Sequence, residues 1–285
     1  MRLLTIAASA IIIAMAAQPA GADTSLTIMT YNIHHGRGLD GEVDLERLAQ
    51  VIRAEDPDVV CLQEVDRGMD RTDGLDMPAF FAAALDMEVV YQTNLRIGEG
   101  EYGNATLSRY PITDHEDWSL PGPEEAEPRG CLKTTIDVNG VAVHVLNTHM
   151  GLDEEERKAQ AGSILDRMPD GPVILAGDVN EETGAPAINA FLEVFQDTFT
   201  QHTGDVEYTF RADDPRRRID YILATPHLDV LSSRVIASEE AQIASDHLPY
   251  VAAVSVPDLP ESAADRGVFG VDDERVEEAV GEEHP

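Results

Sequence analysis

Short apolar stretches that end in polar side chains recur along the chain and constrain its fold more than any other feature. Each reads as a buried strand, and four of them occupy residues 26–33, 58–65, 140–150 and 171–180. Two later strands are RIDYILAT, which contains Asp220, and YVAAVSV, which follows Asp246 and His247. A layered sheet built from such strands gathers their polar ends along one rim, where ligands bind.

Amphipathic helices separate several of these strands. Asp44 is a favourable N-cap for a helix with Leu45, Leu48 and Ile52 on one face, and a following proline predicts its end near Asp56. Further helices are predicted over residues 78–85, 153–168 and 186–195. The second of these begins with an Asp-x-x-Glu capping-box spacing. Because helices follow some strands and turns follow others, we predict a layered α/β sandwich instead of a purely parallel sheet.

The two ends of the chain differ from its middle. Residues 1–22 combine Arg2, an apolar run and a small-residue cleavage site after Ala22, which is typical of a secretory signal peptide. Residues 257–285 hold ten acids, two arginines and few apolar residues, which predicts a disordered acidic tail. We therefore predict one domain over residues 23–256 in an exported protein, either periplasmic or secreted.

The net charge narrows the choice of partners. It is −34 for the whole chain, and loss of residues 1–22, which contain Arg2 and no acid, makes it −34 − 1 = −35. Such a chain repels nucleic acid and anionic lipid unless a metal or a local arginine cluster intervenes, and we disfavour nucleic acid as a substrate. A phosphate-ester substrate, peripheral membrane contact and a monomeric state are the partner predictions that remain.

The two cysteines, Cys61 and Cys131, could pair in an exported protein. Cys61, however, lies in the apolar run VVCLQE, where cysteine commonly serves as a small buried residue. The sequence leaves both possibilities open. No CxxC motif is present, which argues against a thiolate metal site.

The polar strand ends include a set of hard oxygen ligands. Glu64 and Asp246 suit Mg²⁺ or Mn²⁺, and Asn32 adds a neutral oxygen. Mg²⁺ takes only one or two protein carboxylates and leaves positions for water and phosphate. These three residues therefore predict a metal site.

A second set of strand-end residues suits proton chemistry. His247 is a candidate general base, and Asp220 is the carboxylate that would fix its tautomer. Asp178 and Asn180 could hold the attacking water and the phosphate, and His149 could donate to a phosphate oxygen. Each residue alone also has a purely structural explanation, such as an Asx turn at Asp178. Their joint occurrence at strand ends favours a catalytic centre.

Seven motifs then follow one another over about residues 26–256: TYNIHHG, CLQEVD, YGNATLSRYPI, NTHMGLDEEERKAQ, ILAGDVN, RRRIDYIL and SDHLPYVAAV. In this order they resemble the endonuclease/exonuclease/phosphatase superfamily, which includes deoxyribonuclease I-like and neutral-sphingomyelinase-like enzymes. The resemblance implies a four-layer α/β sandwich with two mostly antiparallel sheets flanked by helices. It also implies cleavage of phosphate esters with a divalent metal, normally Mg²⁺.

The resemblance implies the same residue roles. Glu64 matches the main metal ligand, with Asn32 and Asp246 nearby, and Asp220 and His247 match the Asp-His dyad. Asp178 and Asn180 match the pair that orients water and phosphate, and His149 matches a phosphate-binding histidine. His34 departs from the pattern, because family nucleases often have Asn or Asp there. The opening of the domain is similar to small exported bacterial members and to the C-terminal domain of proteins that remodel glycosylphosphatidylinositol lipids.

Five further residues are candidates for substrate binding: His34, His35, Tyr102, Asn104 and Arg157. Arg157 could instead pair with an acid of its own helix, and the arginines at 216–218 could either steer an anion or form a solvated loop. We predict an exported, metal-dependent phosphodiesterase for a lipid-like or small-molecule substrate. An extracellular nuclease is the alternative, and the complete residue set argues against a non-catalytic binding module. The sequence does not choose between His247 and Asp178 as the base, between one metal and two, or between monoester and diester.

Overall fold

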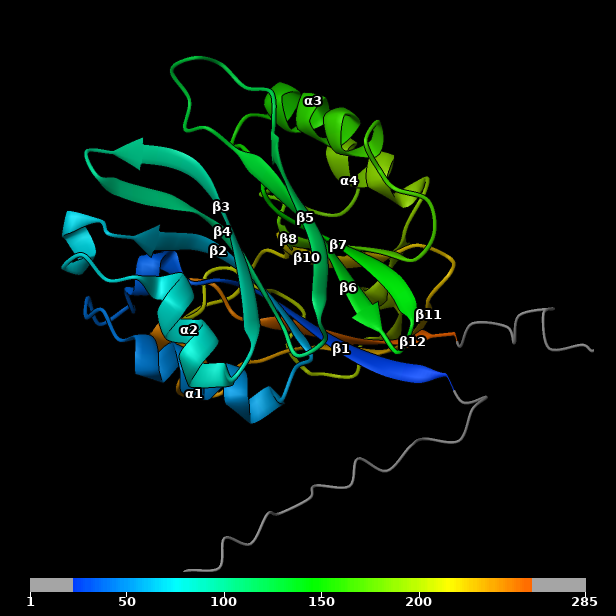
Figure 1. Ribbon diagram of the computed structural model, residues 1–285, viewed down its shortest axis with the longest axis horizontal. Coiled ribbons are helices and arrows are strands. Elements are labelled where there is room, and N and C mark those ends of the chain that lie inside the picture. Colours follow the sequence, from blue (N-terminus) through cyan, green and yellow to red (C-terminus); the bar gives the residue numbers. More distant parts are fainter. Residues whose placement is uncertain (1–22, 258–285) are drawn as a thin grey trace, which may run out of the picture.

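Two six-stranded β-sheets form the centre of the molecule, as the computed structural model, which describes residues 23–257, shows (Figure 1). The first contains β1 (Thr24–Asn32), β2 (Val59–Arg67), β3 (Glu88–Ile97), β4 (Gly100–Ser108), β11 (Asp229–Val235) and β12 (Tyr250–Val256), in the order β11-β12-β1-β2-β4-β3. The second contains β5 (Ile112–Ser119), β6 (Gly130–Val138), β7 (Val141–His149), β8 (Val173–Asp178), β9 (Gln196–Asp197) and β10 (Asp220–Ala224), in the order β5-β6-β7-β8-β10-β9.

Each sheet contains one parallel pair of strands. β1 runs parallel to β2, and β7 runs parallel to β8. Helix α1 (Leu45–Glu55) connects the first pair and helix α3 (Glu154–Leu165) the second, as a parallel pair requires a long crossover. The other neighbouring pairs are antiparallel. The predicted sandwich of two mostly antiparallel sheets flanked by helices is therefore confirmed.

The helices cover the outer faces of the sheets. α1 and α2 (Met77–Leu85) lie on one side, and α3 and α4 (Pro186–Leu192) lie on the other, with both sheets between them (Figure 1). The short helix α5 (Ala241–Ala244) and the 3₁₀ turns η1 (His34–Gly36), η2 (Asp70–Thr72) and η3 (Thr198–Gln201) lie in connecting segments.

Helix α1 begins and ends as the sequence predicts. The Asp44 side chain accepts a hydrogen bond from the Arg47 amide at 3.0 Å, which satisfies one of the free N–H groups of the first turn. Asp56 adopts a left-handed conformation after the last helical residue. Leu48 and Ile52 are fully buried against the first sheet, and truncation of a side chain such as Leu48 to alanine costs about 2–5 kcal/mol.

The capping box predicted for α3 forms only in part. Asp153 accepts from the amides of Glu155 and Glu156, so the N-cap is confirmed. The Glu156 carboxylate does not complete the box, because it accepts a hydrogen bond from Gln160 Nε2 at 2.9 Å. A side-chain partner one turn further along the helix has replaced the backbone amide of the N-cap.

A buried polar network joins the two sheets. Gln63 Nε2 in β2 donates to Asn147 Oδ1 in β7 at 2.8 Å, and Asn147 Nδ2 donates to the carbonyls of Leu62 and Ala105. Gln63 and Asn147 are fully buried, so loss of one partner would leave the other unsatisfied. The network holds the ends of β2 and β7 at a fixed separation, next to Glu64 and close to His149.

The predicted signal peptide (residues 1–22) and nearly all of the predicted acidic tail lie outside the described residues. Within residues 23–257, no helix is long and apolar enough to span a membrane. Cys61 and Cys131 are both buried free thiols, so the structure contains no bond between them.

Candidate active site

Strand pairing aligns three of the predicted site residues at the end of the second sheet. His149 ends β7, Asp178 ends β8, and Asp220 begins β10. Asp178 is in register with His149 on one side and with Asp220 on the other. Because neighbouring strands lie about 4.8 Å apart, these residues form a row across the sheet.

Glu64 lies in a β-bulge of the first sheet. Gln63 and Glu64 of β2 together lie opposite the single residue Asn104 of β4. Glu64 has a left-handed backbone with φ of 59°, which is rare for a residue with a side chain of this size. Bulges of this kind re-aim a side chain at the end of a strand.

Asn32 connects the two sheets at the site. Its Nδ2 donates to Glu64 Oε1 at 3.1 Å and to Asp178 Oδ2 at 3.1 Å. Its backbone carbonyl accepts from Ser245 Oγ at 2.7 Å, which fixes the loop before β12. Asn32 is fully buried, so the Glu64 and Asp178 carboxylates share a preorganised amide.

His247 lies between two buried carboxylates. Its Nδ1 is 2.9 Å from Asp220 Oδ2, and its Nε2 is 3.6 Å from Asp178 Oδ2. The Phe210 ring packs against the imidazole, with ring centroids 4.9 Å apart. The predicted Asp-His pair is thus in direct contact in the structure and shielded from water.

Opposing effects determine whether His247 and its neighbouring carboxylates are protonated. Burial lowers the pKa of His247, but the charges of Asp220 and Asp178 and the hydrogen bond to Asp220 outweigh it and raise the pKa well above its usual range. Burial and the nearby Asp220 raise the pKa of Asp178. The imidazole and its two carboxylates therefore hold a proton together at neutral pH.

His149 lies on the other side of Asp178 and has a different environment. Its Nε2 is 3.5 Å from Asp178 Oδ2, and its Nδ1 is 3.1 Å from Arg129 Nη1. Burial, and then the charge of Arg129, lower the pKa of His149 to about 3. Of the two histidines that flank Asp178, His149 is therefore neutral and His247 protonated at neutral pH.

Glu64, Asp246 and two histidines form the more open part of the site. His35 Nδ1 lies 3.9 Å from Glu64 Oε2, and His34 Nδ1 lies 3.9 Å from Asp246 Oδ1. Burial raises the pKa of Glu64, but His35, His149, Asn32 and His247 together outweigh burial and hold this pKa well below its usual range. Glu64 is therefore an ionised carboxylate at neutral pH.

Comparisons with known proteins assign this arrangement to a family. Residues 29–247 match the Endonuclease/Exonuclease/phosphatase family. The chain belongs to this family.

Relatives agree with the assignment. The Escherichia coli K12 protein YbhP, which is uncharacterized, is 34% identical over 218 residues, or 70% of this chain and 84% of YbhP. A solved endonuclease/exonuclease/phosphatase from Beutenbergia cavernae is 30% identical, with a TM-score of 0.70 over 82% of this chain and 72% of that one. The Bacteroides thetaiotaomicron mannosyl-6-phosphatase Bt3783 shares the fold at 20% identity, with a TM-score of 0.67 over 80% of this chain and 99% of that one.

Endonuclease/exonuclease/phosphatase enzymes use divalent metals, and the residues here fit such an ion. Glu64 and Asp246 supply carboxylate oxygens. Asn32 instead turns its Nδ2 toward Glu64, and its Oδ1 accepts from the His34 amide at 3.0 Å. Asp246 Oδ1 is a buried oxygen without a hydrogen-bond partner among the described residues, as expected of a position that faces a cation. Glu64 and Asp246 would hold the metal, and the predicted ligand role of Asn32 stays a prediction.

A second group also has metal-like spacing. The ligand atoms of Asp178, Asp220 and His247 lie within 4.8 Å of one another. However, the hydrogen bond between Asp220 and His247 Nδ1 already occupies the nitrogen that faces Asp220. This group therefore suits the sharing of a proton, although Asp220 Oδ1, like Asp246 Oδ1, is buried without a hydrogen-bond partner among the described residues.

Three further residues predicted for the site, Asn104, Tyr102 and Asn180, have well-defined contacts. Asn104 Nδ2 donates to the Gly130 carbonyl, and its Oδ1 is buried without a partner among the described residues. Tyr102 is buried beneath the Arg71 guanidinium, which lies 5.1 Å from the ring centroid. Asn180 donates its backbone amide to Asp178 Oδ1 and its side-chain amide to the Met150 carbonyl. Asn180 thereby orients the Asp178 carboxylate.

Arg157, the predicted phosphate-binding arginine, contacts protein groups in the structure. Arg157 donates to Glu181 Oε1 at 3.1 Å and to the carbonyls of Gly151 and Leu152. Its partner is therefore neither Asp153 nor Glu154, the two acids of the alternative interpretation. These contacts support the loop that follows His149.

The arginines at 216–218 do not form a free basic cluster. Each pairs with a carboxylate, respectively Asp214, Glu182 and Asp197. The pairing favours the interpretation of this segment as a charge-balanced loop.

Sequence reasoning missed two residues that contact the histidines of the candidate site: Arg129 contacts His149, and Phe210 contacts His247. Arg129 stands in the polar segment EEAEPRG, immediately before Gly130, which is in register with His149. The one available signal was a charged residue at the start of a strand, on the rim where the other polar ends gather. Phe210 lies in an irregular loop, and no pattern in the sequence connects it to His247.

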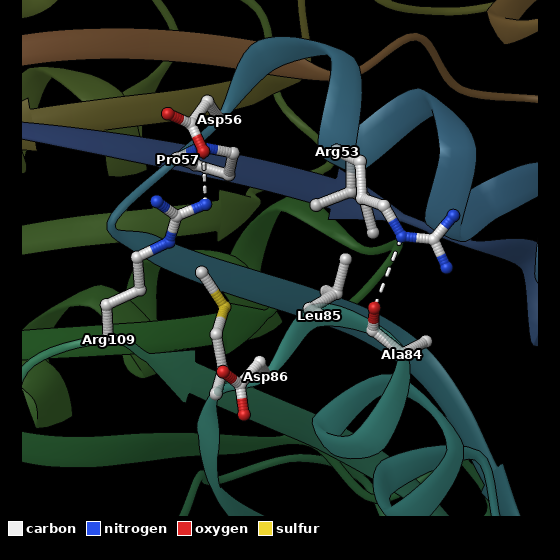
Figure 2. A pocket seen from close by; sticks show the side chains of 9 residues that line it. Arg53, Asp56, Pro57, Ala84, Leu85, Asp86 and Arg109 are labelled. Carbon is white, nitrogen blue, oxygen red and sulfur yellow. Dashed lines mark hydrogen bonds and ion pairs between the residues drawn. The ribbon is translucent and has the colours of Figure 1, made fainter. Parts of the chain in front are cut away.

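A surface hollow of the protein is separate from the candidate active site. It lies where the ends of α1 and α2 meet the turn after β4 (Figure 2). Arg109 there pairs with Asp56, and Arg53 donates to the Ala84 carbonyl (Figure 2). Because the charges of Arg109 and Asp56 cancel, we assign no binding role to this hollow.

Proposed function

We propose that the protein is an exported, divalent-metal-dependent phosphodiesterase that hydrolyses a lipid-like or small-molecule diester, with Mg²⁺ as the normal metal and Mn²⁺ as a substitute. The observation that supports it is the convergence of three nitrogen groups on Asp178 Oδ2. Asn32 Nδ2, His149 Nε2 and His247 Nε2 lie 3.1, 3.5 and 3.6 Å from this oxygen. Such a carboxylate, at the rim of a sheet and next to hard metal ligands, suits activation of a water molecule.

The residues of the chain would divide the reaction among them. Asp178, oriented by Asn32 and Asn180, would accept the proton of the attacking water. His247, held by Asp220, would stabilise negative charge that develops on the phosphoryl oxygens. Glu64 and Asp246 would hold a metal, with Glu64 oriented by Asn32, and the metal would supply Lewis-acid stabilisation of the phosphoryl and leaving oxygens.

The distribution of cations supports a small or lipid-like substrate over nucleic acid. Within residues 23–257, all arginines except Arg37 and Arg167 pair with a carboxylate, and both lysines do so too. Phosphate-backbone binding depends on cations that are free to replace counterions. The similarity of the opening motif to enzymes of glycosylphosphatidylinositol lipid remodelling agrees with a lipid-like substrate.

A substrate panel tests this proposal. Purified protein with Mg²⁺ is assayed on bis-p-nitrophenyl phosphate, p-nitrophenyl phosphate, phospholipid and phosphoinositide vesicles, plasmid DNA and RNA. The His247→Ala variant, purified in the same way, reports contaminating activity. We expect the highest specific activity on a small or lipid diester. Faster cleavage of DNA or RNA would favour the nuclease alternative, and dominant monoester cleavage would make the protein a phosphatase.

We further propose that residues 1–22 direct export and that the mature protein is a monomer. Fractionation of cells that express the chain with and without residues 1–22 tests the first point. Light scattering of the purified protein tests the second, and a dimer mass would contradict it.

A further inference from the structure

We propose that Arg129 is a positioning residue that fixes the tautomer of His149, so that His149 presents Nε2–H to the reaction site. The inference deepens the proposed function and rests on it for its catalytic meaning. Its structural content, the location of one proton on one imidazole, can be measured without turnover.

The contact follows from strand register. Gly130, the first residue of β6, is in register with His149, the last residue of β7. Arg129 precedes this pair, and its Nη1 lies 3.1 Å from His149 Nδ1. The exposed fractions of the two side chains are only 8% and 6%, so water does not compete for the contact.

The chemistry of the two groups decides which nitrogen carries the proton. A guanidinium has only donors, so His149 Nδ1 must accept the hydrogen bond. A neutral imidazole with an accepting Nδ1 carries its proton on Nε2. A proton on Nδ1 would point at the arginine and leave two donors face to face.

A neighbouring acid fixes the guanidinium itself. Arg129 Nη1 also donates to Glu127 Oε1 at 2.6 Å. The two hydrogens of Nη1 are therefore engaged by Glu127 and His149. This chain of contacts ends at His149 Nε2, 3.5 Å from Asp178 Oδ2.

The partners of the two active-site histidines are therefore opposite. Asp220, an acceptor, contacts His247 Nδ1 and favours a charged ring, whereas Arg129, a donor, contacts His149 Nδ1 and favours a neutral one. His149 thus becomes a hydrogen-bond donor to a phosphate oxygen and cannot serve as the base through Nε2. This division leaves Asp178, which lies between the two rings, as the acceptor.

Nitrogen NMR of the full protein labelled with ¹⁵N-histidine tests the assignment. The signals of His149 are identified by their loss in His149→Ala. We expect His149 to be neutral and protonated only at Nε2 in the wild type. Arg129→Met should produce a mixture with the Nδ1–H form, and Arg129→Lys, which retains a donor, should restore Nε2–H at least in part. A wild-type His149 with Nδ1–H, or a tautomer unchanged in Arg129→Met, would overturn the proposal.

A double-mutant cycle separates positioning from direct substrate binding. We expect Arg129→Met to lower kcat about tenfold and to have little further effect in the His149→Ala background. Losses that multiply would show that Arg129 acts on the substrate by itself and would refute the positioning role. Arg109→Met, at the hollow of Figure 2, is the matched control and should leave both kcat and the His149 spectrum unchanged. If no phosphoester is turned over, the proposed function fails, and the wild-type spectrum still decides the tautomer.

Discussion

The two halves of the site are built in the same way and are hydrated differently. We call Glu64, Asp246, His34 and His35 the open half, and His149, Asp178, Asp220 and His247 the closed half. In each sheet a parallel strand pair, joined by a helix, delivers polar residues to the same rim. Yet the exposed fractions of Asp246 and Glu64 are 26% and 20%, whereas those of Asp178 and Asp220 are 2% and 1%.

The loop before β12 shows how sharply the two halves are separated. Asp246 and His247 are adjacent in sequence, but Asp246 lies beside His34 in the open half and His247 lies between the carboxylates of the closed half. A metal ion that exchanges water ligands needs access to solvent, which the open half provides. A proton shared between buried groups is better held where solvent is excluded, as in the closed half. One dipeptide therefore supplies both halves.

Removal of the metal is the strongest way to disable the open half. Dialysis against EDTA should reduce turnover to background, and added Mg²⁺ should restore it, because the oxygen ligands suit a hard cation. Thermal unfolding measured in the same samples shows whether the closed half stays folded. Full activity in excess EDTA would contradict the metal site.

Substitutions in the closed half should lower kcat and leave the response to Mg²⁺ intact. We expect His247→Ala, Asp178→Asn and Asp220→Asn each to reduce kcat by about a hundredfold or more. Asp178→Asn loses the proposed proton acceptor, His247→Ala loses the group that stabilises charge, and Asp220→Asn loses the carboxylate that orients His247. The measurement is kcat across a Mg²⁺ titration. His227→Ala, at an exposed histidine in the turn before β11, is the matched control. A His247 variant that is folded and nearly as active as wild type would show that the dyad assignment is wrong.

Arg157→Met tests whether Arg157, which lies next to the closed half, supports the fold or binds substrate. The substitution leaves the buried Glu181 with only its two backbone donors, so the free energy of unfolding should fall by about 2 kcal/mol. Because Arg157 contacts protein groups, kcat of the folded variant should change less than about twofold. Urea unfolding and steady-state kinetics measure the two effects. Unchanged stability with a raised KM would support the phosphate-binding role predicted from the sequence.

Added salt should change the rate of DNA cleavage only modestly, because it screens the charge of the whole surface and acts on neither half of the site directly. With a net charge of −34, the surface repels DNA, and this repulsion extends about 10 Å at 0.1 M salt. Any DNA cleavage should therefore rise modestly as NaCl is added at fixed Mg²⁺, while cleavage of a small diester changes little. A decrease in DNA cleavage with salt, as for basic nucleases, would support a local basic groove and the nuclease alternative.

Much of this architecture could be predicted because the decisive signals are local. The N-cap Asp44 and the apolar face of α1 fix that helix within the sequence window that contains it. The polar ends of β1, β7 and β8 indicated a common rim because strand ends meet there. The roles of these residues stay predictions until the variants are measured.

Other elements could not be predicted because their causes lie far away in sequence. β5 consists largely of exposed and acidic residues, and pairing of Asp114 and Glu116 with Lys133 of the next strand supports it. The Arg129 contact depends on the register of β6 with β7. The α3 capping box is incomplete because Glu156 accepts from the Gln160 side chain and not from the N-cap backbone amide. Both partners are acceptable, and the local sequence pattern does not decide between them.

The backbone of Glu64 implies a trade-off between stability and activity. A non-glycine residue held at a φ of 59° costs about 1–3 kcal/mol, and here the bulge places that cost on Glu64, the proposed metal ligand. Glu64→Gly and Glu64→Ala both lose the carboxylate and its contacts, but only glycine adopts this φ without strain, so Glu64→Gly should melt at a higher temperature than Glu64→Ala while both lose turnover. If so, the backbone at this position favours glycine, and a glutamate there reflects selection for the carboxylate.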